Sequence, residues 1–154
     1  MHENRLELMD ADVQQSLKLF VVLSRASKTL MDYAQHDMKH YQLNPSEFAV
    51  MEMLYHKGST PIQQIGGKVL LASGTMTYVV DKLVNKGYIK RRPCEQDRRV
   101  IYAELTEEGE RVMTAIFPKH AAAIHESMRG LTADEKQQLI ELLKTLGQSA
   151  TSPD

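Results

Sequence analysis

The segment from Thr60 to Leu105 constrains the fold of this 154-residue chain more than any other. Two short blocks of apolar residues at helical spacing are followed by two strand-like blocks, with little chain left for connections. From Lys57 to Arg99 there are nine basic and three acidic residues, a net charge of +6. The whole chain carries −1, so the remainder carries −7. We therefore expect a compact basic unit with one face suited to a polyanion.

The composition is that of an ordinary soluble globular protein, with 42% hydrophobic and 25% charged residues. No apolar run approaches the roughly 18 residues that a membrane span needs, so no membrane association is expected. The first twelve residues are too polar for a secretory signal. A single cysteine cannot form an internal disulfide, which favours a reducing, cytoplasmic location.

A long helix is predicted to begin at Asp12, because Asp12 with Gln15 three residues later resembles a capping box. No Pro or Gly occurs from there to His40, so one continuous helix is expected. Its middle, Leu19–Leu23, is apolar on nearly all sides and must be covered from more than one direction. In a chain this small, we expect another subunit to supply the second covering surface.

The next helix has a strong start at Asn44, Pro45 and Glu47, which combine a cap, a first-turn Pro and a Glu three residues after the cap. Lys57 and Gly58 should end it.

Thr60-Pro61-Ile62-Gln63 repeats the start signal and predicts a short helix from Thr60. A turn at Leu70–Ala72 should lead into a second helix from Ser73 to Lys86, stopped by Gly87. Its inward face is predicted to be Met76, Val79, Val80, Leu83 and Val84.

Two short strands are predicted at residues 88–92 and 100–105, with the polar turn Glu95–Arg99 between them. Thr106 and the acids after it should begin a helix. We expect Pro118 to kink that helix rather than end it.

A capping box from Thr132 to Glu135 predicts a last helix, carrying Leu139, Leu142, Leu143 and Leu146. The fold class expected is mainly α with a small β wing, a winged helix-turn-helix with long terminal dimerisation helices. The predicted divisions are 1–11 disordered, 12–43 N-terminal dimerisation helix, 44–105 DNA-binding domain, 106–147 C-terminal dimerisation helices and 148–154 disordered tail.

Two short helices joined by a tight turn form a helix-turn-helix, whose second helix fits the DNA major groove. Its exposed N-terminal residues are small or hydroxylated, which allows close approach to base edges. The hairpin that follows should place Arg98 and Arg99 in an adjacent minor groove, and Asp97 should brace an arginine so that its guanidinium is pre-aimed. The candidate DNA contacts are Thr60, Gln63, Gln64, Ser73, Gly74, Thr75, Thr77, Tyr78, Lys82, Arg91, Arg92, Asp97, Arg98 and Arg99.

Two stretches of the chain carry a family resemblance. Asp97-Arg98-Arg99 followed by Leu105-Thr106-Glu107-Glu108-Gly109 resembles the wing signature of the MarR family of bacterial transcription regulators. Ser73–Thr77 and Asp81–Ile89 are similar to that family's recognition helix and strand entry. The resemblance covers about residues 12–147 and implies a homodimer that reads a palindromic operator in double-stranded DNA. It also implies that Asp97 and Arg99 are the wing pair, with Arg99 the minor-groove reader.

The resemblance further suggests a pocket for a small aromatic or phenolic effector near the junction of the long helix and the DNA-binding unit. The candidate residues are Phe20, Tyr33, Met51 and Tyr55, which supply adaptable Met walls and Tyr hydroxyls. Similarity at Leu17–Ala26 and Asn44–Gly58 suggests the branch that answers quinone-like or phenolic compounds. These features predict a repressor released by its effector.

Several features of the sequence allow other interpretations. Cys94, near Arg91 and Arg92, is either a thiolate sensor of oxidants or electrophiles or a small filler residue in the hairpin. The basic face could instead meet an acidic protein partner. Asp32, His36 and His40 share a helix face, which we interpret as a solvated polar stripe rather than a metal site. No cofactor is expected, and the absence of a nucleophile with a positioned base argues against an enzyme.

Overall fold

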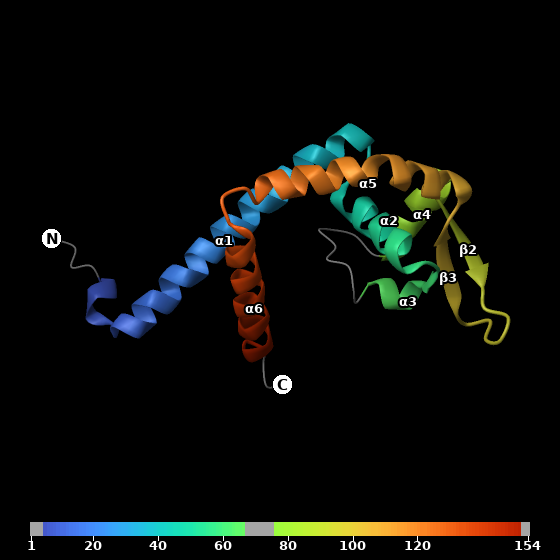
Figure 1. Ribbon diagram of the computed structural model, residues 1–154. Helices are drawn as coiled ribbons and strands as arrows, with labels where there is room; N and C mark the ends of the chain where they lie inside the picture. The colour runs from blue at the N-terminus through green and yellow to red at the C-terminus, as the bar shows by residue number, and fades with distance from the viewer. Residues whose placement is uncertain (1–4, 67–75, 152–154) are drawn as a thin grey trace.

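A computed structural model describes residues 5–66 and 76–151 (Figure 1). Its helices, in chain order, are η1 (Arg5–Leu8), α1 (Ala11–Met38), η2 (Lys39–Tyr41), α2 (Pro45–Lys57), α3 (Ile62–Ile65), α4 (Met76–Asn85), α5 (Glu107–Ser127) and α6 (Ala133–Ser149). Its strands are β1 (Thr60–Pro61), β2 (Ile89–Pro93) and β3 (Ile101–Leu105). The predicted fold class, mainly helical with a small β wing, is confirmed. The predicted turn at Leu70–Ala72 lies outside the described residues.

The N-terminal cap of helix α1 lies two residues earlier than the sequence predicts. Asp10 is its cap, and the Asp10 carboxylate accepts a hydrogen bond from the Asp12 backbone N–H at 2.9 Å. The prediction of a cap at Asp12 is therefore wrong, because Asp10 already holds the extended backbone and the free carboxylate that a cap requires. Of the described α1 residues, Ala34 and Met38 near its C-terminal end are buried. The N-terminal part of this helix extends away from the globular body (Figure 1).

The connection from α1 to α2 is short and tightly bonded. Gln42, with φ 57°, turns the chain in the left-handed region after η2. Asn44 then caps α2 through the predicted box: its Oδ1 accepts from the Glu47 N–H at 2.8 Å, and its own N–H donates to Glu47 Oε1 at 3.2 Å. The helix ends at Lys57 and Gly58, also as predicted.

The described strands form one antiparallel sheet in the order β1-β3-β2. Thr60 pairs with Ala103 and Pro61 with Tyr102, so β1 is an edge strand. The prediction that a helix begins at Thr60 is wrong, because this residue is in a strand and α3 starts only at Ile62. An edge strand accommodates Pro61, whose missing N–H would break a ladder on a central strand.

The hydrophobic core lies between α2, α4, α5 and the sheet. It includes Phe48, Met51, Leu54, Ile65, Leu83, Ile89 and Met113, each fully or almost fully buried. On α4, Val79, Val80 and Leu83 are buried and Met76 and Val84 are partly buried against this core. The inward face predicted for this helix is therefore confirmed.

A polar pair, His120 and Asp37, links α5 to α1 beside this core. His120 of α5 is 6% exposed, and its Nδ1 lies 2.9 Å from Asp37 Oδ2 of α1. The His120 ring also packs on Phe48 of α2, with centroids 4.4 Å apart. One histidine thus joins three helices, a role that the sequence did not indicate.

The first turn of helix α5 lies in close contact with the backbone of Tyr88, next to the sheet. Thr106 caps it by accepting from the Gly109 N–H at 3.0 Å, as predicted. A Cβ atom on Gly109 would lie 2.1 Å from the carbonyl oxygen of Tyr88, so only glycine fits there. Pro118 lies inside α5 without ending it.

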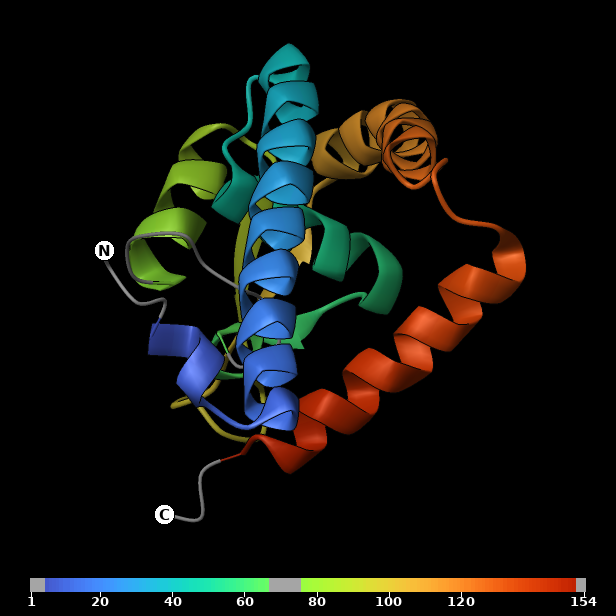
Figure 2. The same ribbon diagram turned by 90° about the vertical axis from the view of Figure 1, so that its left-hand side faces the viewer.

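Helix α6 starts at the predicted capping box of Thr132 and Glu135 and extends two residues beyond Gly147. Figure 2 shows α5 nearly end-on, with α6 slanting away from it. No residue of α6, all of which is described, is buried. Its four exposed leucines, Leu139, Leu142, Leu143 and Leu146, recur at helical spacing on one face.

Candidate nucleic-acid interface

The wing is a two-stranded hairpin with a closed tip. Strands β2 and β3 pair from Ile89 opposite Leu105 to Pro93 opposite Ile101. Beyond the last pair, the Cys94 N–H donates to the Val100 carbonyl and the Val100 N–H donates to the Asp97 carbonyl, each at 3.0 Å. These bonds hold the charged turn at the far end of the sheet, away from the core.

Asp97 braces Arg99 at the wing tip. Asp97 Oδ1 accepts from the backbone N–H and the Nε of Arg99, each at 3.1 Å, and Oδ2 accepts from Nη2 at 3.3 Å. The Arg99 side chain is nevertheless 91% exposed, so the guanidinium is oriented without being covered. Gln63 of α3 reaches the same tip, with Nε2 3.5 Å from the Arg99 carbonyl oxygen.

The hydrogen bonds from the Arg99 side chain and backbone hold the pKa of Asp97 below its usual value. A carboxyl with a lowered pKa favours the braced state above its ordinary pKa and loses it only as the pH falls through the lowered value. The brace is therefore intact throughout the neutral range.

Arg91 and Arg92 on β2 are tied to the protein itself. Arg91 pairs with Asp81 on the exposed side of α4. Arg92 lies 3.4 Å from Glu104, donates to the Ser59 hydroxyl at 3.3 Å and stacks over the Tyr102 ring at 5.0 Å. These contacts join the wing to α4 and to the segment before β1.

Glu104 sits between the cations of β2. Its partial burial alone would raise its pKa, but hydrogen bonds from Arg92, Lys90 and Ser59 outweigh burial and hold the pKa below its usual value. The carboxylate is therefore ionised and neutralises part of the positive charge on the wing strands.

The outward face of α4 carries Thr77, Tyr78, Asp81 and Lys82, all exposed. The Lys82 ammonium lies 5.2 Å from the centre of the Tyr78 ring, which is 56% exposed. Gln63 and Gln64 of α3 are exposed as well. The predicted contacts Ser73, Gly74 and Thr75 lie outside the described residues.

Thr60 differs from the other candidates. Its side chain is buried, with 6% of the residue exposed, and its hydroxyl donates to the Gly58 carbonyl at 3.0 Å. Thr60 therefore exposes little surface that a ligand could contact. The missed strand β1 explains this position, because pairing with β3 turns Thr60 into the core.

The four candidate effector residues are not gathered in one cavity of the single chain. Met51 is fully buried, and the Tyr55 hydroxyl lies 3.4 Å from the Thr114 hydroxyl of α5. On α1, Phe20 is 71% and Tyr33 39% exposed. These two lie thirteen residues apart on one helix, which is about 20 Å along its axis.

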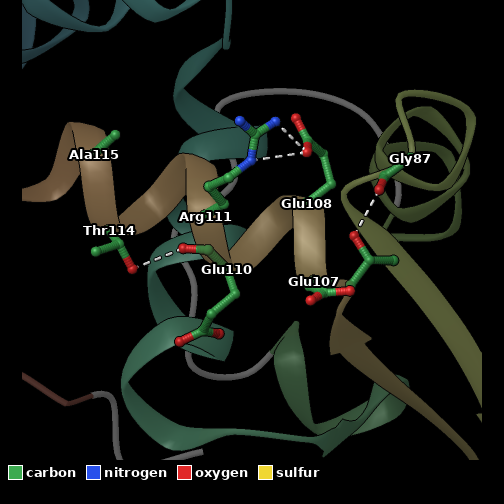
Figure 3. A pocket seen from close by; sticks show the side chains of 8 residues that line it. Gly87, Glu107, Glu108, Glu110, Arg111, Thr114 and Ala115 are labelled. Atoms are coloured by element: carbon green, nitrogen blue, oxygen red, sulfur yellow. Dashed lines mark hydrogen bonds and ion pairs between the residues drawn. The ribbon is translucent and has the colours of Figure 1, made fainter.

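Figure 3 shows a different hollow, a surface groove of about 1010 Å³ at the start of α5. Glu107, Glu108 and Glu110 line it, and Arg111 pairs with Glu108 beside them. The Thr106 hydroxyl donates to the Gly87 carbonyl across its edge at 2.6 Å. Its acidic lining is opposite in charge to the wing and does not suit a nucleic acid.

Cys94 is partly exposed at the base of the hairpin tip. In the described parts of the chain, no three His, Cys, Asp or Glu side chains gather as a metal site would require. Asp32 pairs instead with Lys28 at 2.7 Å, and the rings of His36 and His40 meet edge to face at 5.9 Å. Within the described ranges no helix is long and apolar enough to cross a membrane.

A helix with an exposed polar face, a preceding short helix and a basic hairpin at the sheet edge define a winged-helix DNA-binding protein. A sequence model of the MarR family matches residues 43–101. The HTH-type transcriptional regulator MhqR of Bacillus subtilis (strain 168) is 49% identical over 137 residues, which cover 89% of this chain and 94% of MhqR. The chain therefore belongs to the MarR family and is an HTH-type transcription regulator rather than an enzyme.

Solved structures share the fold. Sco3205 of Streptomyces coelicolor, a MarR-family regulator in complex with DNA, aligns with a TM-score of 0.78 at 17% identity, over 94% of this chain and 95% of that one. BpsR of Bordetella bronchiseptica, whose DNA binding is regulated by 6-hydroxynicotinic acid, aligns with a TM-score of 0.74 at 18% identity, over 84% of this chain and 98% of that one. At these identities the likeness concerns the fold alone.

Proposed function

We propose that this regulator is a homodimeric repressor that binds a palindromic operator and is released by a small aromatic, phenolic or electrophilic effector. The observation that carries the proposal is the braced and 91% exposed Arg99 at the wing tip. A cation that is oriented before binding loses less conformational freedom when it contacts a phosphate or a base edge.

In the proposed complex, α4 lies in a major groove and the wing reaches the neighbouring minor groove. Thr77, Tyr78 and Lys82 on α4 contact bases or phosphates, as do Ser73, Gly74 and Thr75 before it. Arg98 and Arg99 enter the minor groove. Gln63 and Gln64 contact the DNA backbone. Arg91 holds the wing against α4 through Asp81, Arg92 holds it against Ser59 before β1, and both add positive potential. Thr60 contributes through its backbone position rather than its side chain.

The dimer follows from apolar surface that one chain leaves uncovered. On α1, Leu19 and Val22 are 53% and 54% exposed, and Phe20 is 71% exposed. The apolar face of α6 is uncovered too. Contiguous apolar surface of this kind marks an interface, and a second copy with the same faces covers both by two-fold symmetry. Two winged heads would then read half-sites about 10 base pairs apart.

The effector is proposed to act where the helical arms meet the head. Met51 of α2 is fully buried in the core of the head, and Tyr55 of the same helix contacts α5 through Thr114. BpsR, whose DNA binding 6-hydroxynicotinic acid regulates, supports a small aromatic ligand for this chain. An effector that prefers one separation of the two heads would shift the dimer away from the DNA-binding shape.

The test is selection of bound duplexes from a random pool, followed by band-shift titration of the selected duplex. We expect a palindromic sequence bound at nanomolar concentration, and release when candidate phenols or quinones are added. Failure to enrich any sequence would contradict operator binding and favour the alternative, in which the basic face binds an acidic protein.

A second route to release is modification of Cys94, which is partly exposed at the wing. Replacement of Cys94 by Ser should abolish release by oxidants and quinones while leaving DNA affinity unchanged, because Ser keeps the size and the backbone bond to Val100. If the Cys94→Ser protein is still released, the effector binds reversibly and the thiol has no part in sensing.

A further inference from the structure

Lys86 links the end of α4 to the connection between α1 and α2. Its Nζ lies 2.6 Å from Glu47 Oε2 and donates to the Gln42 carbonyl at 3.1 Å. Gln42 is the left-handed residue that turns the chain after α1, and Glu47 is in the first turn of α2. A single ammonium therefore touches both sides of the joint between arm and head.

Each carboxylate oxygen of Glu47 lies against a different partner, Oε2 against Lys86 and Oε1 against the Asn44 N–H. Its side chain is 4% exposed, and its second oxygen, Oε1, accepts from the Asn44 N–H in the capping box. The Lys86 side chain is 36% exposed. A carboxylate that is this deeply buried and hydrogen-bonded is costly to leave without its cation, so the pair resists any rotation of α4 relative to α2.

We propose that Lys86 and Glu47 are positioning residues for DNA reading, which fix the angle of α4 relative to the arm by tying its C-terminal end to the Gln42 turn. This inference rests on the proposed operator binding. A change in the angle between α1 and α2 would pull on the same ammonium, so the tie transmits the shape of the dimer arms to the recognition helix.

The direction in which Glu47→Gln changes DNA affinity separates a positioning role from a purely electrostatic one. Removal of an acidic charge normally strengthens binding to a polyanion, since it lowers repulsion. Glu47 is buried and cannot touch DNA. If it positions α4, Glu47→Gln weakens binding although the protein becomes more positive. Gln is nearly the same size and still serves in a capping box, so the start of α2 is retained.

The experiment compares Glu47→Gln with Glu126→Gln in band shifts on the duplex selected by the wild-type protein. Glu126 is a matched control because it is a 63% exposed carboxylate in a surface pair with Arg129. We expect about tenfold weaker binding for Glu47→Gln, with unchanged or slightly tighter binding for Glu126→Gln. Circular dichroism at the binding temperature confirms that both variants are folded. Equal or tighter binding by a folded Glu47→Gln protein would overturn the inference.

The role of Lys86 is tested by substitutions that keep or remove its charge, and by the salt dependence of DNA affinity. Lys86→Arg keeps a cation and should retain most of the affinity, whereas Lys86→Met should lose about as much as Glu47→Gln, without further loss when both are combined. The slope of log affinity against log salt should stay unchanged in Lys86→Met. A slope reduced by about 0.9 would mean that Lys86 contacts a phosphate directly and would overturn the positioning role. If the wild-type protein selects no duplex, it is the proposed function that fails instead.

Discussion

Gly109 is a single residue on which the junction of wing and α5 depends. Its missing side chain lets the first turn of α5 lie on the Tyr88 carbonyl, which also accepts from the Thr106 N–H at 3.0 Å. We expect Gly109→Ala to lower the free energy of unfolding by about 3 kcal/mol, because the added methyl must displace backbone rather than a flexible side chain. Urea unfolding at fixed protein concentration measures it.

Gly130→Ala is the control, since an added Cβ there meets nothing within 4 Å. Similar unfolding midpoints for the two variants would show that the junction adjusts and that the close contact is unimportant.

Arg99 is the residue on which DNA affinity should depend most. Arg99→Ala removes an oriented, exposed cation from the wing tip and should weaken operator binding at least about tenfold without unfolding the protein. Arg111→Ala removes a cation of similar exposure from α5, at 75% against 91%, and should have little effect. Band shifts on one duplex compare the two variants. An equal effect of both would exclude the wing from specific reading.

At the level of elements, α6 buries none of its residues against the part of the chain that the structure describes. Leu142 and Leu143 are 67% and 39% exposed on its apolar face. We expect Leu142→Glu combined with Leu143→Glu to shift the protein from dimer to monomer, because two carboxylates would have to be buried at the interface. Sedimentation velocity gives the oligomeric state.

Gln148→Glu adds charge on the opposite face of α6 and should leave the dimer intact. If the doubly charged variant stays dimeric, the proposed interface does not include this face of α6.

At the level of the whole molecule, positive charge is concentrated on the head, while the chain as a whole carries −1. Operator binding should therefore weaken steeply with salt, with a log–log slope of about −0.9 for each neutralised phosphate. Titrations of the protein at several salt concentrations give this slope. A flat response would contradict phosphate contacts and favour an acidic protein partner.

The helices and the wing were predictable because their signals are local. Asn44 with Glu47, Thr106, and Thr132 with Glu135 are caps whose partners lie within one turn of helix. The hairpin and its Asp97 brace likewise depend on neighbours in sequence. The incorrect prediction of a helix start at Thr60 also came from a local signal. A Thr before Pro resembles a helix cap, but the same pair suits an edge strand when β3 lies beside it.

The sequence by itself thus determined the class of fold, the basic head and the family resemblance, since spacing and local charge are written in consecutive residues. Tertiary structure alone decided which charges stay exposed. It ties Arg91 to Asp81, His120 to Asp37 and Lys86 to Glu47. The partners in these pairs lie ten or more residues apart, so their meeting depends on how whole helices pack rather than on any local preference of the backbone.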